Sequence, residues 1–350
     1  MSSEYTEILG LIEREVLAVL PEEPDDSWFD RFFGALPASP RADIRRALNA
    51  PALELVRRGG KRWRPLLLVL SARALGREDG ALSISPVVEI AHNGTLIVDD
   101  IEDGSDTRRG GPAIHLLHGI DASVNAGNLL YFLPLVLFDE LRTSPATRLA
   151  LHARYALHMR RLHLGQAMDI TWHRDHGSLP DRDSYLAMCA LKTGVLARAA
   201  AELGALAALA PEAMVSGLGS AFERVGVAFQ ILDDVANLRT GNPGKKRGDD
   251  IVEGKKSLPV ILACEREAGL APHLALLFDA ARAGGPEAPA VEEAIGLIAG
   301  EGAVDAAEAI ALEMLRESAR MLSTLVPPGP ASGPLLGLVD ALSGRGAAKL

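Results

Sequence analysis

The sequence has few of the residues on which small secreted domains and β-sheets depend. Its two cysteines, Cys189 and Cys264, are too few for a disulfide framework or a cysteine-ligated zinc cluster, and we interpret both as small apolar core residues. Aromatic residues make up only 4% of the 350 residues. The apolar share of 48% is carried mostly by alanine and leucine, which favours packed helices over sheets.

Positive charge is also scarce. Lysine and arginine number 36 against 46 aspartates and glutamates, which gives a formal net charge of −10. Nonspecific nucleic-acid binding needs a surplus of cations facing the phosphates, so we expect no nucleic-acid partner. The same deficit raises a question for any other anionic ligand, because the chain's own charge would repel it.

Long hydrophobic runs and a basic leader are missing as well. Residues 65–70 form an apolar run far shorter than the ~20 residues that span a bilayer. Residues 1–7 are acidic and lack the positively charged start of a secretory signal peptide. We therefore expect no transmembrane segment and a cytoplasmic protein.

Helical periodicity recurs along nearly the whole chain, and no convincing alternating strand pattern interrupts it. Apolar residues one helical turn apart predict an amphipathic N-terminal helix that ends before Pro21. Ser85 and Pro86 supply an N-cap and a first-turn proline, which predicts a helix that runs to about Asp103. Further helices are expected at 122–142, 145–172, 182–209, 213–239, 257–268, 290–300 and 303–325.

Breaks in this pattern are strongest at residues 103–112, 173–180 and 239–256, and a Pro/Gly cluster at 327–334 precedes a candidate last helix. Neither an internal repeat nor a flexible linker is visible. We predict an all-α fold in which residues 1–350 form one large helical-bundle domain, with residues 1–50 as a helical addition at the N-terminus.

An acidic cluster at residues 99–103 ends one of the predicted helices. Asp99 and Asp103 are one helical turn apart and face the same way, with His92 and Leu96 on that face. Two close carboxylates repel by roughly 1 kcal/mol in water and ~4 kcal/mol at an effective dielectric near 20. Such a cluster favours a cation, and oxygen ligands suit Mg²⁺. The alternative is a solvated acidic helix end.

A second polar stripe lies in an otherwise apolar helix more than a hundred residues later. It consists of residues at spacings i, i+3, i+4 and i+7, namely Gln230, Asp233, Asp234 and Asn237. Polar groups in such a place are costly unless a ligand or metal satisfies them. Two acidic pairs in apolar context are much rarer than one, so together they favour a metal site.

Cations surround both acidic motifs. Lys61 and Arg64 follow a glycine break at residues 59–60, and Arg108 and Arg109 follow the first acidic cluster. Lys192 begins a Lys-Thr-Gly segment that interrupts a helix, and Lys246 and Lys255 flank residues 248–251. Each alone is more often a solvated charge than a ligand. Together with two acidic clusters they indicate a diphosphate site.

Taken in order, these motifs resemble those of the trans-type isoprenyl diphosphate synthases, the family of farnesyl and geranylgeranyl diphosphate synthases. The similarity runs from about Glu54 to Pro259 through GGKRWRP, HNGTLIVDDIEDGSDTRRG, GQAMDI, LKTG, FQILDDVANL and KKRGDDIVEGKKS. The family implies a helical bundle around a central apolar cavity and a homodimer. It also implies Mg²⁺-dependent condensation of isopentenyl diphosphate with dimethylallyl, geranyl or farnesyl diphosphate.

The resemblance assigns roles residue by residue. The residues that would hold Mg²⁺ on the allylic diphosphate are Asp99, Asp100, Asp103, Asp233 and Asp234. Those that would bind the same diphosphate directly are Arg108, Lys192 and Lys246, with Lys255 as an addition. The isopentenyl diphosphate site would consist of Lys61, Arg64, His92 and Arg109. Oxygen dipoles beside the carbocation would come from Thr193 and Gln230, which join Asp99, Asp103, Lys192 and Asp233 as the residues of the catalytic step.

Product length follows in this family from the residues four and five before the first aspartate. Here these are Thr95 and Gly94, with Ala91 one turn below, and all three are small. We therefore expect a tunnel that continues past fifteen carbons and a geranylgeranyl product. Tyr131 and Phe132 are candidates for its floor, with core packing as the alternative for each.

One departure from the family pattern is Asn237, where a third aspartate is usual. Some eukaryotic-type geranylgeranyl diphosphate synthases share this ending, but the coordination there is left open. A farnesyl or longer-chain synthase, a terpene cyclase and a non-catalytic synthase subunit are the alternative functions. A cyclase would need a second motif that this chain lacks, and the full set of acidic and basic residues argues against an inactive subunit.

Overall fold

The computed structural model describes residues 3–36, 41–78, 80–175, 178–241, 246–300, 302–326 and 328–342. Nearly all of this part of the chain is helical, so the predicted all-α fold is confirmed. The first helices are α1 (Ser3–Val19), α2 (Asp26–Phe33), α3 (Arg41–Ile44), α4 (Ala50–Arg57), α5 (Trp63–Ala74), α6 (Ala81–Ile84), α7 (Pro86–Glu102), α8 (Ile114–His118), α9 (Ile120–Leu129) and α10 (Val136–Glu140).

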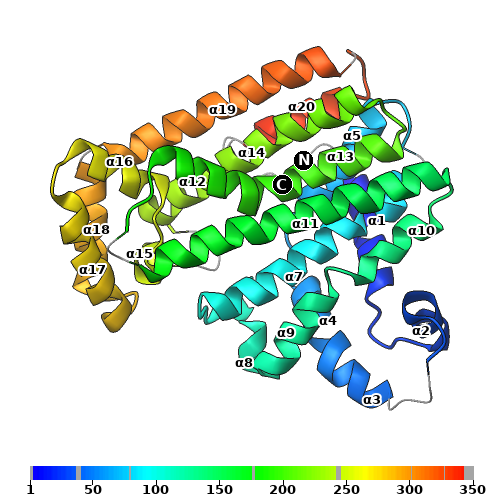
Figure 1. The fold of residues 1–350 in the computed structure, drawn as a ribbon, viewed down its shortest axis with the longest axis horizontal. Helices are drawn as coiled ribbons and strands as arrows, with labels where there is room; N and C mark the ends of the chain where they lie inside the picture. Colours follow the sequence, from blue (N-terminus) through cyan, green and yellow to red (C-terminus); the bar gives the residue numbers. More distant parts are fainter. Residues whose placement is uncertain are drawn as a thin grey trace.

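The second half of the chain contains the longest helices. These elements are α11 (Pro145–Arg174), α12 (Arg182–Cys189), α13 (Val195–Ala207), α14 (Glu212–Arg239), α15 (Asp249–Glu253), α16 (Leu258–Arg266), α17 (Leu270–Gly284), α18 (Pro289–Gly300), α19 (Ala303–Leu325) and α20 (Gly333–Leu342). Figure 1 shows α11, α14 and α19 running along the length of the molecule, with α15 to α18 gathered at one end. Helix α13 packs against α5, α11 and α14, which places it inside the bundle.

Three short elements interrupt the predicted helices. The helix expected at 122–142 is wrong as a continuous element, because Pro134 lies in a 3₁₀ turn, η2 (Leu133–Leu135), between α9 and α10. The helix expected at 182–209 contains a π-helical turn, η3 (Ala190–Gly194), and another, η1 (Arg45–Asn49), precedes α4. Helix α17 was not predicted; its Pro272 lies in the first turn, where proline is tolerated.

One continuous apolar core links the helices from Tyr5 in α1 to Leu342 in α20. The predicted N-terminal helix is confirmed, because Ile12 and Val16 are fully buried and α1 packs against α5 and α7. Cys189 lies within this core, and Cys264 packs against its edge.

Glycines let the backbones of the central elements approach closely. A Cβ added at Gly165 of α11 would lie 2.5 Å from the backbone nitrogen of Lys192, and one at Gly226 of α14 would lie 2.6 Å from Cα of Gly194. Only residues without a side chain allow such distances. Element η3 is thus held between α11 and α14, and its side chains lie close to polar residues of both helices.

Two helical stretches have the length and apolar composition of a membrane span. Ala81–Glu102 is 67% buried over its most apolar window, and Ile120–Glu140 is 44% buried. Buried core helices pass the same test, and the first stretch also ends in the acidic residues Asp99 and Asp100. The absence of a transmembrane segment therefore stays a prediction.

Candidate active site

A cavity of about 500 Å³ lies where α5, α7, α11, η3 and α14 meet, a size typical of small-molecule sites. Its walls combine apolar side chains such as Leu96 and Leu162 with charged ones. The predicted site residues that line it are Lys61, Arg64, His92, Thr95, Asp99, Arg108, Arg109, Lys192, Thr193, Gln230, Asp233, Asp234 and Lys255. The structure thus brings together residues that are far apart in the sequence.

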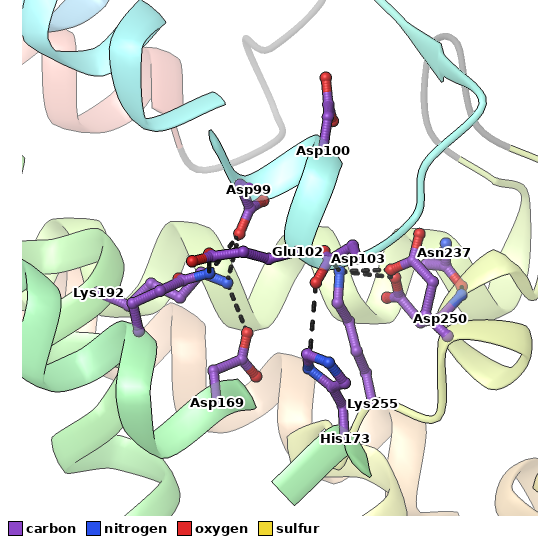
Figure 2. Close-up of polar contacts among 12 residues, drawn as sticks. Asp99, Asp100, Glu102, Asp103, Asp169, His173, Lys192, Asn237, Asp250 and Lys255 are labelled. Carbon is purple, nitrogen blue, oxygen red and sulfur yellow. Dashed lines mark hydrogen bonds and ion pairs between the residues drawn. The ribbon is translucent and has the colours of Figure 1, made fainter. Parts of the chain in front are cut away.

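Lys192 reaches in from one side of the acidic cluster, between Asp99 and Asp169 (Figure 2). Its Nζ lies 3.1 Å from Oδ1 of Asp99 and 2.5 Å from Oδ2 of Asp169. Burial alone would lower the pKa of Lys192, but these two carboxylates raise it above its usual value. Burial would likewise raise the pKa of Asp99, but the charges of Lys192, Lys255 and Arg108 hold it well below its usual range. Both groups are therefore charged at neutral pH.

Asp103, at the end of α7, is in a different electrostatic state from Asp99. Its nearest cation is Lys255, whose Nζ is 3.5 Å from Oδ2, and Nδ1 of His173 is 4.0 Å from Oδ1. Burial and the negative charge of Asp99 raise the pKa of Asp103 to about 6. A carboxyl with this pKa is ready to ionise fully when a further cation arrives.

Asp100 is buried and does not share the face of Asp99 and Asp103. Figure 2 shows its carboxylate pointing away from theirs, as expected for neighbours on a helix. Oδ1 of Asp100 accepts a hydrogen bond from Nε of Arg108 at 2.8 Å. The same guanidinium lies 4.0 Å from Asp99, so Asp100 holds Arg108 beside the acidic cluster.

The second polar stripe forms a chain of hydrogen bonds. The hydroxyl of Thr193 donates to Oε1 of Gln230 at 2.9 Å, and Nε2 of Gln230 donates to Asp234 at 2.9 Å. The hydroxyl of Tyr185 donates to the other oxygen of Asp234 at 2.5 Å. Burial and the nearby charge of Asp250 raise the pKa of Asp234 to about 7. This chain of hydrogen bonds fixes the orientation of Oγ1 of Thr193 and Oε1 of Gln230 at the cavity wall.

Asn237, the unusual end of the second motif, lies one turn further along α14. It is fully buried, and its Oδ1 accepts a long hydrogen bond of 3.4 Å from the backbone N–H of Asp250. The amide therefore binds the segment that carries Asp250 and Lys255.

A short hairpin separates Arg108 from Arg109. Strands β1 (Thr107–Arg108) and β2 (Gly111–Pro112) are joined by Arg109 and Gly110, whose φ angles are 50° and 74°. Positive φ at both turn residues is typical of the two-residue turns that suit a twisted hairpin. This turn directs Arg108 to Asp100, whereas Arg109 donates to Asn93 at 2.9 Å and reaches another part of the cavity.

That other part is lined by cations and aromatic rings. Arg64 is buried, donates to Nε2 of His92 at 3.3 Å and lies 4.6 Å from the centre of the Trp63 ring. Burial and the charge of Arg64 lower the pKa of His92 well below its usual value, so this histidine is neutral. Lys61 lies over the ring of Phe229 at 5.8 Å.

Several predicted residues lie outside the cavity lining. Lys246 is exposed and pairs with Glu287 at 2.7 Å, so the structure does not bring it to the other cations that were predicted to bind a diphosphate. Ala91 is fully buried, and Gly94 faces α9, where an added Cβ would lie 2.7 Å from the carbonyl oxygen of Gly127. Phe132 is 67% exposed and is therefore not a floor of the cavity. Of the residues assigned to product length, Thr95 and Tyr131 line the cavity.

Sequence reasoning assigned no role to several residues of the site. Nε2 of Gln166 donates to Asp99 at 2.8 Å and to Glu102 at 2.7 Å, and Asp169 binds Lys192. Both belong to the GQAMDI segment, where their i, i+3 spacing on one helix face was the available signal. Tyr185 had no such signal, because only the fold brings it to Asp234.

The acidic residues fit a hard divalent cation. In the described ranges, no three histidine, cysteine or carboxylate side chains already converge as a metal site, since cations hold most of the carboxylates. Asp99 and Asp103 nevertheless offer only oxygen donors, and Oδ2 of Asp103 is buried without a hydrogen-bond partner. Oxygen donors of this kind are those that Mg²⁺ and Ca²⁺ prefer.

An all-helical bundle with acidic segments on two helices and two groups of cations around one apolar cavity defines a synthase of isoprenoid diphosphates. The sequence matches the family model for polyprenyl synthetases over residues 45–282, and the chain belongs to this family of prenyltransferases. The resemblance seen in the motifs is thereby confirmed.

Relatives and solved structures agree with this assignment. The chain is 34% identical to the geranylfarnesyl diphosphate synthase of Aeropyrum pernix, over 83% of this chain and 92% of that protein. It is 35% identical to the geranylgeranyl diphosphate synthase of Methanosarcina mazei, over 61% of this chain and 66% of that protein. The fold matches geranylgeranyl pyrophosphate synthetase from Pyrococcus horikoshii Ot3 with a TM-score of 0.82 and 27% identity, over 98% of each chain.

A further structural match is informative about ligands. Polyprenyl synthase from Caulobacter crescentus CB15, solved with calcium and isoprenyl diphosphate, has a TM-score of 0.78 and 29% identity over 99% of each chain. The family thus acts on isoprenoid diphosphates with a divalent metal, and this chain is a chain-elongating prenyltransferase.

Asp99 and Asp103 should affect stability in opposite directions at pH 8, and only the effect of Asp103 should change between pH 8 and pH 5. The pKa of Asp103 is about 6 in the fold against 3.8 unfolded, so the folded chain holds a proton that the unfolded chain has lost between these values. The contribution of Asp103 to the free energy of unfolding of the wild type therefore rises as the pH falls from 8 to 5. In metal-free buffer, Asp103→Asn should raise the free energy of unfolding at pH 8 and raise it by less at pH 5.

Asp99→Asn is the contrasting variant. Because the pKa of Asp99 is lowered in the fold, its charge stabilises the folded chain above the unfolded pKa of 3.8, so the variant should be destabilised at pH 8. Urea unfolding at both pH values measures the effects. Equal shifts for the two variants, or a shift for Asp103→Asn that does not depend on pH, would contradict these electrostatic assignments.

Proposed function

We propose that this chain condenses isopentenyl diphosphate with an allylic diphosphate (dimethylallyl, geranyl or farnesyl) in a Mg²⁺-dependent reaction and forms geranylgeranyl diphosphate. The observation that carries the proposal is the presence of two distinct cation groups around one cavity. Arg108, Lys192 and Lys255 lie among carboxylates, whereas Arg64 and Arg109 lie near the neutral His92, and Lys61 lines the same cavity over the Phe229 ring.

The first group suits the allylic diphosphate. Asp99, Asp103 and Asp233 would hold Mg²⁺ there, and the metal when bound supplies positive charge that stabilises the leaving diphosphate. Asp100 holds Arg108, and Asp234, which itself lines the cavity, holds Gln230. Arg108, Lys192 and Lys255 add donors aimed at the same place, so charge that develops as the C–O bond breaks meets groups already in position.

Thr193 and Gln230 suit the carbocation that this bond breaking leaves. Their oxygen atoms are fixed by the hydrogen-bond chain to Asp234 and Tyr185, and they lie on the cavity wall next to Lys192. Apolar residues such as Leu96, Leu162 and Phe229 keep water away from the cation.

The second cation group holds isopentenyl diphosphate so that its double bond can attack the cation. The attack forms the new C–C bond, and loss of a proton then restores a double bond. His92 is neutral and hydrogen-bonded to Arg64, and we assign the proton to the departing diphosphate.

Asp99→Ala tests the metal-dependent half of the site. Turnover with Mg²⁺ should fall by about two orders of magnitude or more, because the variant loses both a metal ligand and the partner of Lys192. Turnover is measured as incorporation of labelled isopentenyl diphosphate. Asp305→Ala, which removes an exposed carboxylate on α19, is the matched control and should be unchanged. Near-normal condensation by a folded Asp99→Ala protein would refute the assignment.

The depth of the cavity bears on product length. Tyr131 is 7% exposed, lines the cavity and packs edge-on against His163, with ring centres 5.5 Å apart. Thr95 of α7 also lines the cavity. We propose that the Tyr131 ring limits the growing chain and that the small Thr95 leaves room for twenty carbons.

Tyr131→Ala should therefore shift products toward longer chains, and Thr95→Tyr should shift them toward farnesyl length. Phe132→Ala is the matched control, because this neighbouring ring is 67% exposed and is not part of the cavity lining. Chromatography of dephosphorylated products, with primers of increasing length, gives the distribution. Identical products from wild type and Tyr131→Ala would remove Tyr131 as the floor.

We also propose a homodimer. Large apolar side chains are exposed on α8, at the start of α9 and on α11: Leu116, Leu117, Ile120 and Leu164, which are 49–60% exposed. A second copy of the chain would cover them. In sedimentation equilibrium the wild type should be a dimer and the double variant Leu117→Glu/Ile120→Glu a monomer, whereas Leu276→Glu on α17 should remain dimeric. A monomeric wild type would refute the proposal.

Cytoplasmic location stays a prediction.

A further inference from the structure

Two buried polar residues of α7, Glu89 and Asn93, lie behind the second cation group. They are one helical turn apart and are 2% and 0% exposed. Glu89 is negatively charged at the cavity wall, and Asn93 is not part of the cavity lining, so neither suits direct contact with a diphosphate. Their position inside a group of arginines nevertheless requires an explanation.

Every polar atom of the Asn93 side chain is used. Its Nδ2 donates to the backbone oxygen of Glu89 at 2.7 Å and to Oε1 of Glu89 at 3.0 Å, and its Oδ1 accepts from Nη1 of Arg109 at 2.9 Å. The reverse orientation would place two donors against Arg109 and an oxygen against Glu89. Glu89 therefore determines which way the amide faces.

Glu89 in turn is fixed by Arg62. Its Oε1 accepts from Nη1 of Arg62 at 2.6 Å and lies 3.8 Å from Nη2 of Arg109. Arg62 is also buried and donates to Glu13 at 2.9 Å and to the carbonyl oxygen of Val56 at 2.7 Å. A rigid set of contacts thus extends from α1 and α4 through Arg62 and Glu89 to Asn93.

The guanidinium of Arg109 needs such support because the position of the Arg109 backbone does little to fix it. It belongs to the two-residue turn between β1 and β2, and its other hydrogen bond is a long one of 3.3 Å to the carbonyl oxygen of Leu55. Gly60 faces its guanidinium, where an added Cβ would lie 3.1 Å from Nη2. Burial lowers the pKa of Arg109 to about 10, which leaves it charged at neutral pH, and Glu89 is the nearest carboxylate that favours this charge.

We infer that Asn93 is a positioning residue for the isopentenyl diphosphate site, which orients Arg109 through its Oδ1 while Glu89 fixes the amide. The inference rests on the proposed function, because it takes Arg109 as a ligand of isopentenyl diphosphate. A preoriented guanidinium loses less conformational entropy when it binds a diphosphate. Removal of the Asn93 side chain should therefore weaken the binding of isopentenyl diphosphate and not that of the allylic substrate.

The two diphosphate sites of one chain provide an internal control. In Asn93→Ala, KM for isopentenyl diphosphate should rise by about ten-fold or more, as expected for loss of a hydrogen bond to a charged group, while KM for the allylic primer changes by less than about two-fold. Asn49→Ala is the matched control. It removes a different buried amide, which donates to the carbonyl oxygen of Pro21 at 2.7 Å, and should leave both KM values unchanged.

Two further variants separate positioning from general damage. Asn93→Gln keeps an amide oxygen for Arg109 and amide donors for Glu89, so it should recover part of the affinity lost in Asn93→Ala, and it also serves if the alanine variant does not fold. In an Arg109→Ala background, Asn93→Ala should raise KM for isopentenyl diphosphate no further, because its effect passes through Arg109.

Each result has one meaning. Equal increases of both KM values in Asn93→Ala, or a full additional increase on top of Arg109→Ala, would overturn the inference. If Arg109→Ala raises KM for isopentenyl diphosphate and neither Asn93 variant does, the site stands and the positioning role is wrong. If Arg109→Ala leaves that KM unchanged, the proposed site itself is wrong.

Discussion

The pairing of buried charges around one cavity is the constraint on which the rest of this structure depends. Lys192 lies between Asp99 and Asp169, Arg108 is held by Asp100, and Lys255 is close to Asp103. Charged groups removed from water are strongly unfavourable unless partners of opposite charge are near. Without substrate the acids and bases satisfy one another. In the proposed reaction, the same cations would face the diphosphate and the same acids would hold the divalent metal.

This arrangement also answers the question raised by the net charge of −10. The charge of the whole chain matters less than its distribution, because the cations that could meet an anion are concentrated at the cavity. Lys192, Arg108 and Arg109 reach it from η3 and from the β1–β2 hairpin. The close contacts at Gly165 and Gly226 bring η3 between α11 and α14, so small residues set the distances between the charged ones.

Much of the fold and the site follows from the sequence, because local patterns determine them. Helical spacing indicated α7 and α14 and placed Asp99 with Asp103, and motif order predicted the cavity residues. Contacts between distant segments were not predictable in this way. Asp100 and Asp234 are aspartates like their neighbours Asp99 and Asp233 in the motifs. The directions in which their side chains point nevertheless depend on hydrogen bonds with Arg108 and Tyr185. Gly94 is small because α9 packs against it, and Lys246 pairs with Glu287, which is remote in sequence.

The hairpin between β1 and β2 has a consequence for how the two substrates are arranged. Arg108 and Arg109 are consecutive, yet one binds Asp100 beside the acidic cluster and the other binds Asn93 behind the second cation group. One two-residue turn therefore connects the proposed allylic and isopentenyl sites through the shortest possible stretch of backbone. In the proposed reaction, the reach of two adjacent arginines would set the separation of the two phosphate-bearing ends, so a shift of this turn would change the alignment of both reactants together.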